Sequence, residues 1–217
     1  GDFPPSALSG LLHGYISVYS IVRVSPWLED VYGSQWDIHE RIREIAGELA
    51  DLIQDPSVTL EDRVGHIADL MEAYLTYSDM DFLDIALDAA YGIISPEGRD
   101  EIVLPCRTPE MCRLLCSYYY FTGEERCAEL AGEIIKERGT EIFNKSVEEP
   151  LENRWNWYRA EEFYENIIGE EKHEKVKNML MLEEEFWKQF GKDIDSKDLT
   201  VSTLCFDNLA LKEYSLI

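Results

Sequence analysis

The spacing of apolar residues constrains the fold of this chain more than any other feature. Apolar positions recur every three to four residues along nearly all of its 217 residues, and the alternation of a half-buried strand is almost absent. With 45% hydrophobic residues the chain can also bury a core of its own, which excludes a disordered chain or a fibre. The sequence therefore predicts an all-α protein.

Short polar residues mark the beginnings of the predicted helices, where a side chain can accept a hydrogen bond from a free backbone N–H. The predicted N-caps are Ser34, Thr59, Asp79 and Thr108. Pro109 suits a first helical position, because the N–H that it lacks is not needed there. Together these signals predict eight helices, at about residues 5–24, 34–54, 59–77, 80–94, 108–121, 124–138, 150–168 and 170–190.

Three of the helix pairs look like copies of one hairpin. An offset of about 45 residues aligns Tyr74, Tyr119 and Tyr164, each near the end of the first helix of its pair. We therefore expect a single helical-repeat domain over residues 1–217, built from stacked antiparallel hairpins. Its parts are a divergent first hairpin at 5–54, repeated hairpins at 59–94, 108–138 and 150–190, and a C-terminal tail at 198–217. Within the tail, we expect residues 200–206 to form either a short strand or an extended stretch, and a short helix to follow from about Asp207.

Long segments connect the predicted hairpins, whereas the turns inside the hairpins are short. In a stack of hairpins, successive connections emerge on one edge, so we expect these segments to share a face. Either that face carries a ligand, as loops on rigid scaffolds often do, or the segments are spacers that let the helices tilt. They cover residues 95–107, 139–149 and 192–203.

The turn between the helices of the middle pair resembles a known motif. Residues 118–125, read with Cys127, Leu130 and Ala131, resemble the Tyr-x-x-Thr-Gly-Asp/Glu turn of helical-hairpin repeats. Two groups share that turn: α/α toroids of the six-hairpin glycosidase and sugar-epimerase kind, and tetratricopeptide-like or HEAT-like solenoids. The resemblance implies an open toroid-like or superhelical arc of eight to nine helices, because a closed ring of six hairpins needs about twelve. It implies no catalytic residue.

The charge of the chain disfavours some partners. Its 44 Asp and Glu residues exceed its 20 Lys and Arg residues by 24, whereas nucleic acids and anionic membranes attract concentrated positive charge. No run of apolar residues approaches the roughly 20 that a membrane-spanning helix needs. We therefore expect neither a nucleic-acid nor a membrane partner.

The cysteines are odd in number and lie mostly inside helical apolar patterns. This favours reduced, buried thiols in a cytoplasmic protein over a disulfide framework, with Gly1 marking a tag scar or a processed end. Their spacing offers no zinc site, and we expect no metal and no cofactor. They are Cys106, Cys112, Cys116, Cys127 and Cys205.

One helix carries an Asp/His/Asp set at the spacing of a facial metal site or an acid–base pair, made by Asp62, His66 and Asp69. At about 100° per residue, this face points away from the predicted buried stripe. We therefore interpret it as a solvated face. The buried stripe is predicted to hold Leu60, Val64, Ile67, Met71 and Tyr74.

The next helix is apolar around most of its circumference and is interrupted by Asp81, Asp84 and Asp88. Carboxylates cannot lie dry and unpaired, so this acidic strip must face solvent or a polar cavity. In a cavity, Asp84 and Asp88 would be candidates for divided acid and base roles. An ordinary narrow stripe in contact with water is the interpretation that we favour.

The remaining candidates are basic and aromatic. Residues 154–159 form the densest aromatic cluster, in which Trp157 is predicted to be core. Arg99 and Arg107 could hold an acidic ligand, although we favour structural ion pairs with Asp100, Glu101 or Glu110. The candidate ligand-binding residues are Arg99, Arg107, Arg154, Trp155 and Tyr158.

Two functions from different classes fit these features. The first is an interaction module that binds a protein or peptide, since the chain has no nucleophile elbow, phosphate-binding loop or dinucleotide fingerprint. The second is a carbohydrate-binding or carbohydrate-processing protein related to the α/α toroids. Whether the protein is an enzyme stays open, as do its oligomeric state and whether the chain is an open arc, a fragment or a reduced relative.

Overall fold

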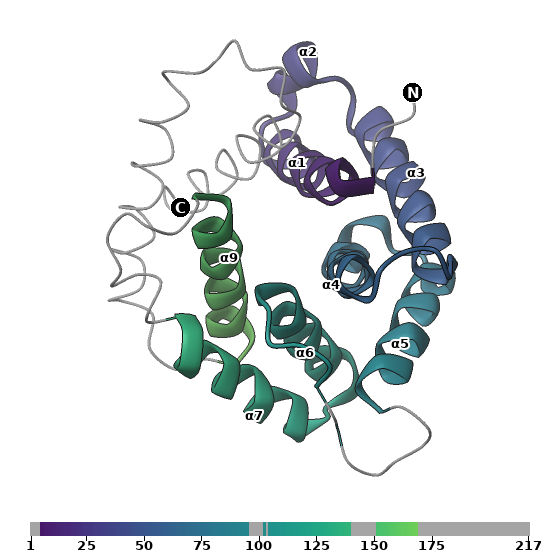
Figure 1. Cartoon of the computed structure of the whole chain (residues 1–217). Helices are drawn as coiled ribbons and strands as arrows, with labels where there is room; N and C mark the ends of the chain where they lie inside the picture. The colour runs from purple at the N-terminus through teal and green to yellow at the C-terminus, as the bar shows by residue number, and fades with distance from the viewer. Residues whose placement is uncertain (1–4, 96–101, 103, 140–150, 169–217) are drawn as a thin grey trace. The chain divides into compact units, whose positions relative to one another are not determined.

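All secondary structure that the computed structural model describes is helical. It describes residues 5–95, 102, 104–139 and 151–168, and no strand occurs among them. The all-α prediction is therefore confirmed. The α-helices are α1 (Pro5–Val24), α2 (Glu29–Tyr32), α3 (Gln35–Gln54), α4 (Leu60–Tyr77), α5 (Met80–Ile94), α6 (Pro109–Thr122), α7 (Glu125–Ile134) and α9 (Leu151–Ile167). A 3₁₀ turn, η1 (Pro26–Leu28), precedes α2, and a π-helical turn, η3 (Ile135–Gly139), follows α7 (Figure 1).

The predicted N-caps hold their helices as expected. The side chains of Ser34, Thr59 and Thr108 accept hydrogen bonds from the backbone N–H groups of Asp37, Asp62 and Met111, respectively. Asp79 Oδ1 likewise accepts from the backbone N–H of Asp81, at 3.1 Å. The short helices η1 and α2 were not predicted. The helix expected at 170–190 and the tail at 198–217 lie outside the described residues.

The offset of about 45 residues recurs in the helix ends. Helices α4, α6 and α9 end at Tyr77, Thr122 and Ile167, which are spaced by that offset. The backbone carbonyl of each aligned tyrosine accepts a hydrogen bond of 2.8 Å from the residue four positions later, and those donors are Ser78, Gly123 and Ile168. Ser78 and Gly123 both adopt the left-handed conformation, with φ of 53° and 74°.

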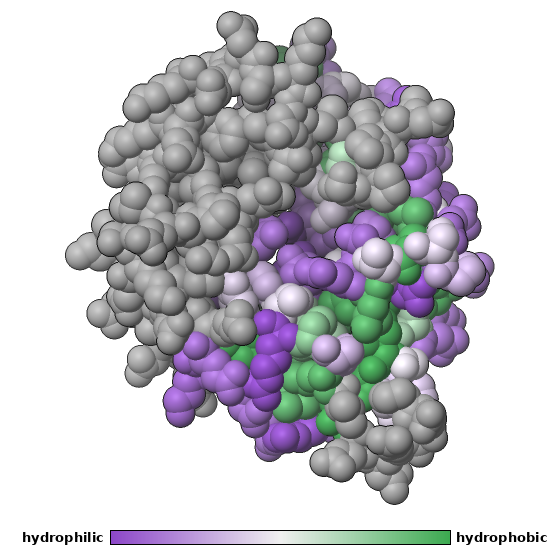
Figure 2. Space-filling model, viewed as in Figure 1, coloured by the Kyte–Doolittle hydropathy of each residue, from purple (hydrophilic) through white to green (hydrophobic). Residues whose placement is uncertain are grey.

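The backbone contacts divide the chain into two units, with a boundary between Ala89 and Ala90, within α5. In the first unit, α1, α3 and α4 pack on one another around a core that includes Leu12, Leu49 and Leu70. The outer side of α3 is polar, with Arg41, Glu44, Glu48 and Asp51 exposed. Hydrophilic residues accordingly gather in Figure 2 along the edge where α3 lies in Figure 1.

The predicted orientation of α4 is wrong in part. Leu60, assigned to the buried stripe, is 46% exposed, whereas His66 and Asp69, assigned to a solvated face, are only 6% and 1% exposed. Asp62 is exposed, as predicted. The reason is that both α1 and α3 pack against α4, so the helix buries more of its circumference than one apolar stripe would require.

In the second unit, α6 packs against both α7 and α9. Trp157 and Ala160 of α9 are buried, which confirms the prediction that Trp157 belongs to the core. Helix α7 contributes Gly132, and the Tyr164 hydroxyl lies 2.8 Å from the position that a Cβ atom would occupy there. The glycine therefore makes room for one of the three aligned tyrosines.

Candidate functional site

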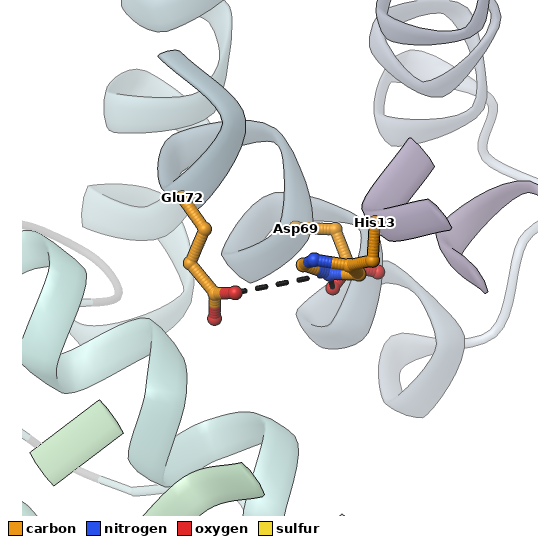
Figure 3. Close-up of side chains that lie close together, drawn as sticks. All are labelled: His13, Asp69 and Glu72. Carbon is orange, nitrogen blue, oxygen red and sulfur yellow. Dashed lines mark hydrogen bonds and ion pairs between the residues drawn. The ribbon is translucent and has the colours of Figure 1, made fainter. Parts of the chain in front are cut away.

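A cluster of one histidine and two carboxylates joins α1 to α4. His13 Nε2 lies 3.0 Å from Asp69 Oδ1 and 3.7 Å from Glu72 Oε2 (Figure 3). Asp69 and Glu72 are three residues apart on α4, so their side chains leave the helix on the same side. Figure 3 shows both carboxylates approaching the imidazole of His13 from α4.

The cluster is shielded from water. The side chains of Asp69, Glu72 and His13 are 2%, 11% and 12% exposed. Electrostatic interactions strengthen at such sites because the surrounding medium screens them less than bulk water does. The cluster is thus both an electrostatic contact between two helices and a set of potential metal ligands.

His66 lies one turn before Asp69 on α4 and is also buried. Its Nε2 has no hydrogen-bond partner within the described parts of the chain. Burial lowers the pKa of this imidazole from its ordinary value of 6.5, and the nearby charges of Asp69 and Asp62 oppose that shift only in part. His66 is therefore a neutral base held inside the first unit.

The sequence did not single out His13. Asp69 is the one residue of the cluster that stands out in the sequence, through its helical spacing with Asp62 and His66. The structure instead brings Asp69 to a histidine that lies 56 residues away. Periodicity within one helix carries no information about which second helix covers it, so this pairing could not be predicted.

A second candidate lies at the surface, where α1 leads into α3. We refer to residues 24–36 as the Val24–Trp36 segment. Among the described residues, ten large apolar side chains are exposed, and half of them fall in this segment. They are Val24 (70%), Trp27 (72%), Val31 (70%), Tyr32 (42%) and Trp36 (71%).

Local structure explains why this segment is exposed. Pro26 begins η1, and Gly33, with a φ of 98°, ends α2 in a conformation that favours glycine. Neither η1 nor α2 buries any of its residues. The segment thus has regular helical structure, but none of the residues of η1 or α2 belongs to the core.

The other predicted site residues are placed as follows. Asp84 and Asp88 are exposed on α5, in agreement with a stripe in contact with water. Arg107 pairs with Glu137 at 2.6 Å and with Glu133 at 3.6 Å, so it takes part in structural ion pairs, while the proposed partners Asp100 and Glu101 lie outside the described residues. Arg99 lies outside the described residues, and the backbones of Arg154, Trp155 and Tyr158 belong to α9. The ligand-binding roles of these residues stay predictions.

The described cysteines behave as predicted for reduced thiols. Cys112, Cys116 and Cys127 are buried thiols, and Cys106 is a half-buried thiol. Burial, assisted by the charge of Glu124, raises the pKa of Cys127 to about 12. This thiol is therefore a poor nucleophile at neutral pH.

Among the helices that the structure describes, none combines the length and the apolar character that crossing a membrane requires. Comparisons with protein-family models, with curated proteins and with solved structures gave no match for this chain.

Proposed function

We propose that the protein is a helical-hairpin interaction module that binds a partner protein through the Val24–Trp36 segment. The exposure of five large apolar side chains within this segment is the observation that supports the proposal. Single exposed apolar residues are ordinary, but a gathering of them marks an interaction surface. Two tryptophans and a tyrosine are also residue types that interfaces favour.

The energetics favour such a surface. Burying one large apolar side chain contributes about 1.5–3 kcal/mol, so Trp27, Trp36 and Val31 would offset a large part of the cost of association, which is about 4–15 kcal/mol. The helices η1 and α2 bury nothing at present. A partner could therefore cover them without disturbing the core of the first unit.

The charge around the segment indicates the chemistry of the partner. Glu29, Asp30 and Asp37 lie within it or next to it, and the whole chain carries a net charge of −24. Complementary charge speeds association and selects among partners. We therefore propose a partner that presents an apolar helix face bordered by lysine or arginine.

The hairpin part of the proposal has its own support. Three helices end at intervals of about 45 residues, and in the last turn of each the backbone carbonyl of an equivalent tyrosine accepts a hydrogen bond. Repeated hairpins typically form extended surfaces for partners. The carbohydrate alternative rests on the resemblance to α/α toroids, on the spacing of 45 residues and on the supply of tryptophan and tyrosine, and it stays a prediction.

A peptide-binding experiment tests the proposal. The probe is a fluorescently labelled helical peptide with leucine at helical spacing and lysine elsewhere, titrated with the full chain at physiological ionic strength. We expect the Trp27→Ala/Trp36→Ala variant to bind at least about tenfold more weakly, because it lacks both exposed indoles. Fluorescence anisotropy measures the affinity.

The matched control is Leu75→Ala/Tyr120→Ala, which removes two other exposed apolar side chains, at 70% and 56% exposure. Its affinity should match that of the unaltered chain. Equal weakening in both variants would overturn the proposal, as would equal binding of a peptide with glutamate in place of lysine. Self-association that depends on Trp27 and Trp36, seen by sedimentation, would assign the segment to a second copy instead.

A further inference from the structure

We propose that His13, Asp69 and Glu72 form a binding site for a divalent transition-metal ion of the manganese, iron or zinc type. The proposal concerns the interior of the first unit and does not depend on the function of the Val24–Trp36 segment. It rests on the distances among the three donor atoms, on the donor types and on the helices that hold them.

The distances suit a single ion. One donor atom from each residue can be chosen so that all three lie within 4.8 Å of one another, and two of the separations are 3.0 and 3.7 Å. An ion that binds ligands at about 2.1 Å places neighbouring donors about 3.0 Å apart in an octahedron and about 3.4 Å apart in a tetrahedron. The two separations from His13 Nε2 therefore lie close to those that such an ion requires.

The donor types select the class of metal. One imidazole nitrogen and two carboxylate oxygens suit borderline divalent ions, since imidazole binds zinc and iron and carboxylates bind manganese. Calcium takes six to eight oxygen ligands, which three side chains including a histidine do not supply. The buried thiols of the second unit would attract soft ions, but His13, Asp69 and Glu72 contain no sulfur.

The scaffold fixes the ligands before an ion arrives. Asp69 and Glu72 leave one helix three residues apart, and His13 comes from a second helix that packs on the first. Ligands on packed helices lose little conformational entropy on binding, unlike ligands on loops. Three protein ligands also leave coordination positions for water or for a small ligand, as catalytic metal sites do.

Binding of Mn²⁺ to the full chain tests the site, because manganese prefers oxygen and nitrogen ligands and leaves the thiols aside. Electron paramagnetic resonance measures free Mn²⁺ after removal of metals with a chelator. We expect one ion per chain to bind with a dissociation constant well below about 1 mM. In the Glu72→Gln variant the affinity for that ion should fall at least about tenfold.

The strongly acidic surface demands a control for weak, scattered binding. Asp69→Asn/Glu72→Gln and Asp84→Asn/Asp88→Asn remove the same number of negative charges, but the second pair lies exposed on α5. We expect only the first pair to lose the stoichiometric ion. Circular dichroism establishes whether each variant is folded. If the Asp69→Asn/Glu72→Gln variant does not fold, the single variant Glu72→Gln replaces it in the comparison.

Several outcomes would overturn the proposal. They are an unaltered chain that binds no Mn²⁺ below about 1 mM, equal weakening in the two double variants, and full affinity in a folded Glu72→Gln chain. A rise in unfolding temperature on addition of Mn²⁺ that is lost in Glu72→Gln and kept in His39→Gln would support it further. His39 is the matched histidine because it lies on α3, where its Nε2 lies 3.1 Å from the backbone carbonyl oxygen of Thr76 and not against the cluster.

Discussion

His66 couples the stability of the first unit to pH. Its imidazole is buried without a hydrogen bond to Nε2 in the described residues, and burial lowers its pKa below 6.5. The unfolded chain therefore binds a proton more readily than the folded chain does. Stability from this residue is complete above about pH 6.5 and is lost as the pH falls toward the lower folded pKa.

We predict that a His66→Gln variant shows a weaker pH dependence of unfolding than the unaltered chain. Glutamine does not titrate, so the proton uptake that favours the unfolded chain is removed. Urea unfolding at about pH 7.5 and about pH 5.5 gives the free energies to compare. Other histidines and the carboxylates titrate in both chains, and identical pH dependence in the two would contradict this prediction.

At the scale of elements, the sequence predicts where each helix begins and ends. It does not predict which helices pack against one another. Capping side chains such as Ser34 and Thr59 act within one turn of their own helix, so their effect is readable from local sequence. Burial depends on the second and third helices of a packing group. The wrong assignments of Leu60 and Asp69 both arise from treating α4 as covered on one side only.

The candidate site follows the same division. Both carboxylates stand on a helix that the sequence predicts, but their histidine comes from α1, and only packing brings the two together. The exposure of Trp27 and Trp36 could not be predicted from the sequence either, because an apolar residue is by default assigned to the core.

Helix α7 offers a test of packing against α9. Replacing Gly132 by alanine favours the helix by about 1 kcal/mol, but the new Cβ would meet the Tyr164 hydroxyl at 2.8 Å. We predict that Gly132→Ala stabilises a Tyr164→Phe chain more than it stabilises the unaltered chain, with a coupling of about 1 kcal/mol. Chemical denaturation of the four chains of this double-mutant cycle measures the coupling, and a value near zero would show that the hydroxyl moves aside at no cost.

For the whole molecule, net charge is the dominant electrostatic feature. Ion pairs such as Arg41–Glu44 and Arg126–Glu129 lie at the surface and contribute little. The excess of 24 negative charges repels itself in the folded chain more than in the expanded one. Salt should therefore stabilise the fold rather than weaken it.

We predict that the unfolding temperature rises as sodium chloride increases from about 10 to about 150 mM, where the screening length falls from about 30 to about 8 Å. Thermal circular dichroism measures the shift. Potassium chloride at the same ionic strength should give the same rise, because screening does not depend on the identity of the cation. A fall in unfolding temperature would instead mean that local ion pairs outweigh the repulsion.

The unequal burial of the cysteines in the second unit has a consequence for their chemical reactivity. Cys112, Cys116 and Cys127 sit where a reagent in solution cannot reach them, while Cys106 is only half-buried. A thiol-specific dye should therefore label Cys106 early and the other three only when α6 and α7 open. In a Cys205→Ser chain, which removes the one cysteine outside the described residues, the rate at which these three thiols react therefore measures that opening.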